Sequence, residues 1–105
     1  MRAPIKPGTT LAQITGPAIE TERLLLRPWR AADVAPNTAM LSDPESARYI
    51  TADRKAVTAE SVGWRNAAVI AGHWALHGFG MFAVEEKSSG RYVGRVGPWY
   101  PPGWP

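Results

Sequence analysis

Arg-Leu-Leu-Leu-Arg-Pro-Trp-Arg-Ala-Ala-Asp, residues 23–33, is the most informative run in this chain of 105 residues. The alternation around Leu24 and Leu26, which share one face, predicts a strand over Ile19–Arg27. The proline that follows has no backbone N–H to donate, so pairing is expected to end there. Asp33 is suited to cap a short helix that runs through Leu41, or to supply an acid in its first turn.

Two further helices are expected downstream. Ser42–Glu45 is typical of a segment that ends one helix and begins another, and it predicts one helical turn to Tyr49. Thr58 is the expected N-cap of the longest helix, and Gly78 is well placed to end it. The apolar stripe of this helix, at spacings of three and four residues, consists of Trp64, Ala67, Ala68, Ala71, Trp74 and Ala75.

The rest of the chain predicts a hairpin: a strand over Gly80–Glu86, a turn over residues 87–90 and a partner strand over Arg91–Gly97. Both faces of the first strand are apolar, so the sheet should be covered on both sides. The predicted helices can cover one face, and the proline-rich residues 98–105 cannot form a helix. We therefore expect the other cover to come from an absent C-terminal half, a partner or self-association.

Composition restricts the class of protein. Hydrophobic residues make up 45% and charged residues 20% of the sequence, as in soluble globular domains. The net charge of +3 is dispersed along the chain, which does not favour nucleic-acid binding. Cysteine is absent, and there is neither a signal-peptide core nor an apolar stretch of membrane-spanning length. A cytoplasmic protein is expected, with residues 1–18 as a flexible tail and residues 19–105 as one domain.

The order of these elements and their local patterns resemble the N-terminal part of the GNAT acetyltransferase fold, within the branch of ribosomal-protein N-terminal-alanine acetyltransferases. The resemblance covers about Ile19 to Pro105. It implies an α/β (α+β) fold of the order strand, helix, helix, strand, hairpin strand, with a mixed, mostly antiparallel sheet and the C-terminal half absent. The residues that carry it are Arg23–Arg27, Asp33, Ser42–Glu45, Arg48, Tyr49, Trp74, Gly78–Gly80, Ala83–Glu85, Lys87, Gly90, Gly94 and Gly97.

This resemblance implies transfer of an acetyl group from acetyl-coenzyme A, as co-substrate, to a primary amine such as a protein N-terminus or a small molecule. In the family, a glycine-rich loop that opens a helix binds the pyrophosphate, and no such motif occurs here. Backbone groups near Val96, Gly97 and Trp99 are the counterparts of those that pair with the pantetheine arm. Trp99 is also either a wall of the acceptor pocket or part of a loop over the sheet edge; for Trp104 the loop is favoured.

Glu85 is the candidate general base that takes a proton from the amine, with Glu86 as its neighbour on the opposite strand face. A solvated strand end is the simpler interpretation of both residues. His73 and His77 are four residues apart, but the chain offers no third histidine or cysteine, so no metal site is expected. The glycines of Gly94–Gly97 suggest a phosphate loop only weakly, since no helix follows them.

The sequence leaves three functions open. The first is an N-acetyltransferase that is truncated or incomplete in this chain. The second is a non-catalytic fragment or a half-domain that binds a partner through its bare sheet face. The third and weakest is a basic module for nucleic acid, which a steep salt dependence of binding would support.

Overall fold

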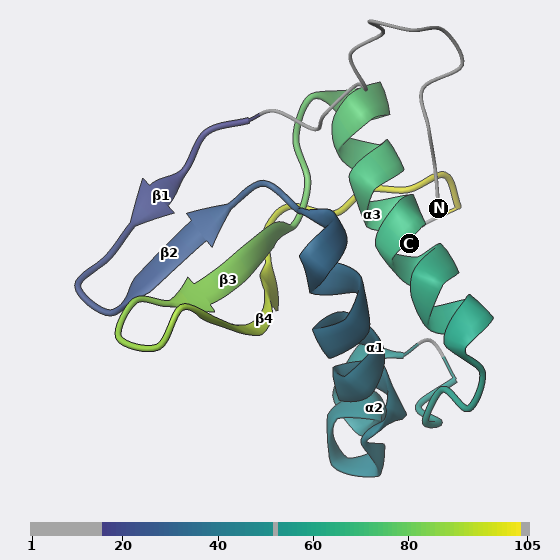
Figure 1. The fold of residues 1–105 in the computed structure, drawn as a ribbon. Coiled ribbons are helices and arrows are strands. Elements are labelled where there is room, and N and C mark those ends of the chain that lie inside the picture. The colour runs from purple at the N-terminus through teal and green to yellow at the C-terminus, as the bar shows by residue number, and fades with distance from the viewer. Residues whose placement is uncertain (1–15, 52, 104–105) are drawn as a thin grey trace, which may run out of the picture.

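A computed structural model describes residues 16–51 and 53–103 of the chain (Figure 1). Four strands and four helical segments follow one another in the order strand, strand, helices, strand, strand. Their bounds are β1 Ile19–Glu20, β2 Leu24–Arg27, the 3₁₀ turn η1 Ala31–Asp33, α1 Val34–Ser42, α2 Pro44–Ile50, α3 Glu60–His77, β3 Phe82–Glu86 and β4 Arg91–Val96.

The strands form one antiparallel sheet in the order β1-β2-β3-β4. Leu26 pairs with Val84 across β2 and β3, and Arg27 pairs with Ala83. The turn between β3 and β4 ends at Gly90, whose positive φ of 71° suits glycine. The predicted α+β fold is therefore confirmed, including the hairpin near the C-terminus. The sheet, expected to be mixed and mostly antiparallel, is antiparallel throughout the described residues.

The single strand predicted over residues 19–27 is instead a short hairpin. Thr21 donates its backbone N–H to the carbonyl of Leu24 at 2.8 Å, and its hydroxyl accepts the N–H of Leu24 at 3.0 Å. This side-chain bond supports a turn, as threonine hydroxyls do in short loops. The prediction of one strand was wrong because the alternating pattern does not reveal that the chain reverses here.

The helix boundaries follow local capping chemistry. Asp43 accepts the N–H of Glu45 at 3.3 Å and caps α2, with Pro44 in its first turn. Gly78 ends α3 in the left-handed conformation, as expected. The N-cap position of α3 is Ala59 rather than Thr58, so that cap prediction was wrong. Asp33 lies at the N-cap position of α1 but makes no side-chain cap bond there; it is the acid in the first turn of η1, which was the other predicted role. Its carboxylate accepts the N–H of Arg30 instead.

The core lies between α3, α1 and one face of the sheet, with α1 and α3 side by side (Figure 1). Ala67 and Ile70 of α3 pack with Trp29 and with Ala83 of β3. Trp74 is buried as predicted, but Trp64 is 59% exposed and does not belong to the apolar face. The predicted apolar stripe of alanines and tryptophans therefore agrees only in part with the buried face of α3.

The opposite face of the sheet is less well covered. Val96 and Ile19, on the two edge strands, are 51% and 47% exposed there. Val84 and Phe82 of the same face are buried, and the ring of Phe82 meets that of Trp74 with centroids 5.1 Å apart. The predicted tail, residues 1–18, lies mostly outside the described residues, and so does Trp104. Across the described ranges, no helix combines the length and the apolar character that crossing a bilayer requires.

Candidate functional site

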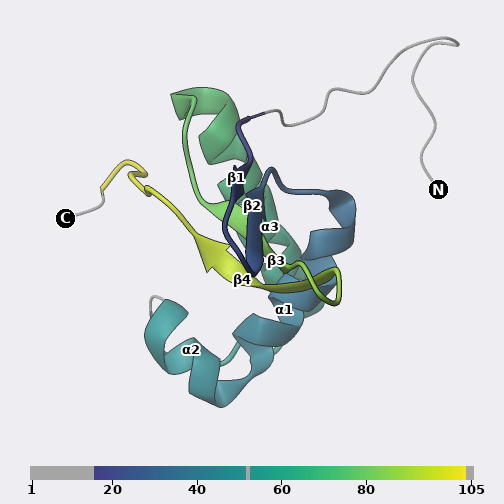
Figure 2. The same ribbon diagram turned by 90° about the vertical axis from the view of Figure 1, so that its left-hand side faces the viewer.

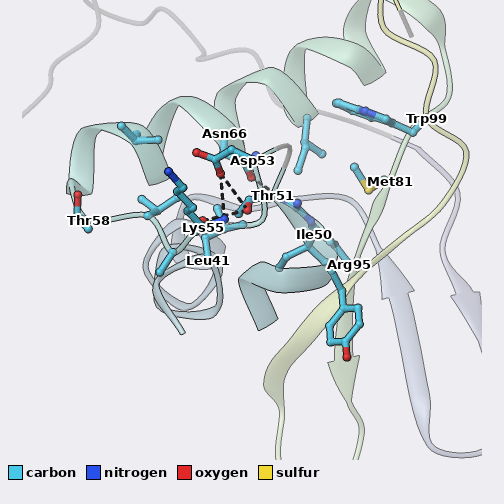
Figure 3. A pocket seen from close by; sticks show the side chains of 15 residues that line it. Leu41, Ile50, Thr51, Asp53, Lys55, Thr58, Asn66, Met81, Arg95 and Trp99 are labelled. Atoms are coloured by element: carbon cyan, nitrogen blue, oxygen red, sulfur yellow. Dashed lines mark hydrogen bonds between the residues drawn. The ribbon is translucent and has the colours of Figure 1, made fainter. Parts of the chain in front are cut away.

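A groove of about 1090 Å³ lies between the helices and the C-terminal end of β4 (Figure 3). Figure 2 shows α2 and the segment after β4 on the same side of the molecule. The lining residues come from the end of α1, from α2, from the segment that links α2 to α3, from α3 itself and from the strand side. On the strand side they are Met81, Arg95 and Trp99, and on α3 they include Asn66 and Ile70.

A polar network lies beside this groove and joins α1, α3 and β4. Asn37 of α1 is fully buried and donates to the amide oxygen of Asn66 at 3.1 Å. The phenol of Tyr92 donates to the amide oxygen of Asn37 at 3.1 Å. The Nη1 group of Arg95 donates to both amide oxygens, with a distance of 3.4 Å to that of Asn37. The network therefore holds Arg95 against two neutral amides.

Burial changes the acid–base behaviour of this network. It raises the pKa of the Tyr92 phenol to about 12, because the phenolate would lose its hydration. It also lowers the pKa of the Arg95 guanidinium, for the corresponding reason that the cation is the form that needs water. At neutral pH the phenol is protonated and the guanidinium is charged.

Glu85, the candidate base, lies in a separate cluster of charges. Its carboxylate accepts the Nε–H of Arg27 at 2.9 Å, and Arg30 lies 4.0 Å from the same oxygen. Asp33 accepts two further hydrogen bonds from Arg27, each of 2.9 Å, and these bonds raise the pKa of the guanidinium. Glu85 is not among the groove-lining residues. Its catalytic role stays a prediction.

Trp99 and His73 join the segment after β4 to α3. Their rings stack with centroids 4.5 Å apart. His73 accepts the N–H of Tyr100 at Nε2, at 2.9 Å, and its Nδ1 lies 2.8 Å from the carbonyl oxygen of Phe79. Both ring nitrogens of His73 therefore pair with backbone groups. Trp99, on the segment that His73 holds, also lines the groove.

The residues predicted for the cofactor lie at or just beyond the end of β4. Val96 is its last residue, on the edge of the sheet that no described strand covers. Gly97 follows with φ of 152° and packs on the backbone of Gly80 and Met81. Trp99 lines the groove, so the structure brings the predicted cofactor strand and the predicted acceptor wall together.

Arg95 and Asn66 are the groove residues that sequence reasoning missed. Arg95 pairs with Ala83 and points inward, but a register shift in the hairpin puts Tyr92, three residues earlier, on the same face, so simple alternation along β4 hides this position. Asn66 is one helical turn before the buried Ile70, on the same side of α3. An amide among apolar residues on that side is a signal that the sequence offered. That signal does not reveal that the two side chains meet.

Comparison with known families identifies the class of protein. The sequence profile of the acetyltransferase (GNAT) domain matches residues 23–105. The chain therefore belongs to the GNAT acetyltransferase family. Members of this family use acetyl-coenzyme A as acetyl donor.

Solved structures agree with the fold. An acetyltransferase from Agrobacterium tumefaciens strain C58 aligns with a TM-score of 0.67 and 24% identity, over 90% of this chain and 53% of the other. A protein from Bordetella pertussis described as a GNAT-family acetyltransferase aligns with a TM-score of 0.64 and 22% identity, over 86% and 51%. This chain thus spans about half the length of either structure. No match was found among the curated proteins.

Proposed function

We propose that this chain takes part in N-acetylation, in which acetyl-coenzyme A donates its acetyl group to a primary amine. The observation that carries this proposal is the position of one strand. The outer edge of β4 is open among the described residues, and the same strand sends Arg95 into the groove. A cofactor arm along that edge and an amine in the groove would therefore lie next to each other.

The open edge suits the pantetheine arm of the cofactor. Its amide groups can pair with an exposed strand as an added strand would. Val96 and Gly97 are the backbone positions we assign to this pairing, and Pro98 interrupts it because it has no N–H. We assign Trp99, which lines the groove beside them, to the wall against which the acceptor packs.

We also propose that catalysis requires structure beyond this chain. The sequence lacks a glycine-rich loop for the pyrophosphate, and the chain spans about half of the solved structures that it matches. On this face of the sheet Phe82 and Val84 are buried, but Ile19 and Val96 on the two edge strands stay exposed, and a second layer could cover them. A second copy of the chain or a further polypeptide segment would supply that layer.

Glu85 is the proposed base, although it lies outside the groove and would act only on an amine that reaches its ion-pair cluster with Arg27. Membership of the branch that acetylates ribosomal-protein N-termini is the proposed subclass.

Amide exchange in the presence of cofactor tests the proposed strand pairing. Successive N–H groups of a strand point to opposite edges, so acetyl-coenzyme A and free pantetheine should both slow the exchange of one of the Val96 and Gly97 amides, the one on the open edge. Adenosine 3′,5′-bisphosphate, which lacks the arm, should not slow it. Protection confined to β1, or equal protection by the bisphosphate, would reject the proposed binding edge.

A further inference from the structure

Two arginines lie on the helix-covered face of the sheet, and their surroundings differ. Arg27 and Arg95 both pair with Ala83, one from each neighbouring strand, so they share a face. Arg27 is neutralised by Asp33 and Glu85, each at 2.9 Å. Arg95 contacts only the amide oxygens of Asn37 and Asn66 within the described residues. Among the described residues, the guanidinium of Arg27 therefore has carboxylate counter-ions and the partly buried guanidinium of Arg95 has none.

A charge that is withdrawn from water is costly unless an opposite charge accompanies it. Burial lowers the pKa of Arg95, which agrees with a poorly hydrated cation. Neutral amides satisfy hydrogen bonds but do not cancel the charge. A ligand that brings an anionic group to Arg95 would supply the missing compensation.

The guanidinium still has donors to offer. Both hydrogen bonds that Arg95 makes to described residues come from Nη1. Its Nε and Nη2 groups therefore have no acceptor among the described residues. In the described ranges, no side-chain nitrogen or oxygen is both sealed from solvent and unpartnered. The Nε–Nη2 edge is therefore accessible, and Arg95 lines the groove (Figure 3). Two donors on one planar edge match the two oxygens of a carboxylate.

The walls of the groove define the rest of the ligand. Ile70, Met81 and Trp99 form an apolar wall near Arg95. The other charged lining residues are Lys55 and Asp53, whose charges are opposite. Asp53 accepts the backbone N–H of Lys55 at 3.0 Å. The charge of Arg95 is therefore the net charge of the groove, which suits a monoanion with an apolar body.

We propose that the groove binds an organic carboxylate, with the carboxylate on the Nε–Nη2 edge of Arg95 and the apolar part along Ile70, Met81 and Trp99. Applied to the acceptor, and resting on the proposed function, this assigns the substrate class as an amine that also carries a carboxylate. The binding site itself does not depend on acetyl transfer.

Nuclear magnetic resonance of the full chain with phenylacetate tests this site without any cofactor. Phenylacetate should shift the Nε–Hε resonance of Arg95, which is identified by its loss in Arg95→Gln. Phenylacetamide, which has the same shape without the charge, should bind at least about tenfold more weakly, as expected for a lost charge-assisted pair. Inorganic phosphate should bind more weakly than phenylacetate, because it gains nothing from the apolar wall.

Two variants separate the site from general charge effects. Arg95→Gln should weaken phenylacetate binding about tenfold or more. Arg91→Gln, which removes an exposed positive charge from the same strand, should leave it unchanged. If Arg95→Gln does not fold, Arg95→Lys keeps the charge but loses the planar edge, and it should still bind several-fold more weakly.

Several results would overturn the proposal. These are the absence of saturable phenylacetate binding, equal binding of the neutral amide, equal affinity in a folded Arg95 variant, or tighter binding of phosphate. Because acetyl-coenzyme A is absent from these experiments, their failure leaves the proposed acetyl transfer standing. Failure of the cofactor to protect β4 would equally leave the carboxylate site standing.

Discussion

At the scale of single residues, Gly97 shows how closely the end of β4 packs on the neighbouring strand. A methyl group at this position would overlap the carbonyl oxygen of Gly80 and come within 2.8 Å of the Cα of Met81. Its φ of 152° is also rare for residues with a side chain. We expect Gly97→Ala to lower the free energy of unfolding by about 1–3 kcal/mol in urea titrations.

Gly72 is the matched control for this substitution. It lies inside α3, and a methyl group there would meet nothing within 4 Å. Gly72→Ala should therefore raise the free energy of unfolding by up to about 1 kcal/mol, since alanine favours helices. Equal destabilisation by both substitutions would show that Gly97 is not constrained by its contact with Gly80.

Asp33 gives a second prediction, because its carboxylate is 2% exposed and bonded twice to Arg27. Asp33→Asn leaves the guanidinium of Arg27 with Glu85 as its remaining acid, and we expect a loss of about 3–5 kcal/mol in the free energy of unfolding. Glu45→Gln breaks an exposed ion pair with Arg48 and should cost less than about 1 kcal/mol. Similar losses in both variants would contradict the burial of the first pair.

Tyr92 makes stability depend on pH in the alkaline range. Burial raises the pKa of its phenol to about 12, whereas an unfolded tyrosine ionises near about 10. The unfolded chain therefore releases this proton first, and stability falls as pH rises from about 10 to about 12. Tyr92→Phe should show a shallower decline in thermal unfolding temperature over that window. An identical decline in both proteins would rule out the buried phenol as a cause.

At the scale of elements, His73 fixes the segment after β4 to α3. Its Nε2 accepts the N–H of Tyr100, and its ring stacks on Trp99. His73→Ala should speed hydrogen exchange of the Tyr100 amide about tenfold, as expected for the loss of one hydrogen bond and its packing. Leu76→Ala, which shortens an 88% exposed side chain of the same helix, should leave this amide unchanged. Unchanged exchange in His73→Ala would mean that other contacts hold the segment.

Elements whose ends depend on local chemistry were predictable from the sequence. Gly78 ends α3, Asp43 caps α2 and Gly90 closes the last hairpin turn, each through contacts within a few residues. The break between β1 and β2 was not predictable, because residues 21–23 between the strands include none of the glycine, proline, asparagine or aspartate residues that mark a turn. Trp64 belongs to the predicted apolar stripe of α3 and yet is exposed. Sequence periodicity identifies such a stripe but does not reveal which elements pack against each part of it.

The candidate site was predictable only where it lies along one strand. Val96, Gly97 and Trp99 follow one another, so their common location follows from the chain itself. Arg95 meets Asn37 and Asn66 across 58 and 29 residues of sequence. Contacts of that range depend on how α1, α3 and β4 pack, and no spacing rule in the sequence encodes them.

At the scale of the whole molecule, the sheet face that carries Val96 and Ile19 predicts self-association. Both side chains are about half exposed, one on each edge strand of the sheet, where a second copy of the chain could cover them. Sedimentation velocity should show oligomers at concentrations at which Val96→Lys is shifted toward monomer. Leu76→Lys alters an even more exposed residue, but on α3, and should not change the oligomer distribution. A sharp monomer peak for the unaltered chain would contradict this prediction.

Acetyl-coenzyme A binding is the most direct measure of the central claim that this chain supplies the cofactor strand of an N-acetyltransferase. We would titrate acetyl-coenzyme A into the purified chain by calorimetry. The account predicts weak but saturable binding, without measurable acetyl turnover by the chain alone, because the open edge of β4 is present and the sequence has no glycine-rich pyrophosphate loop. Absence of any saturable heat would contradict the claim, whereas the membership of the chain in the GNAT family would remain.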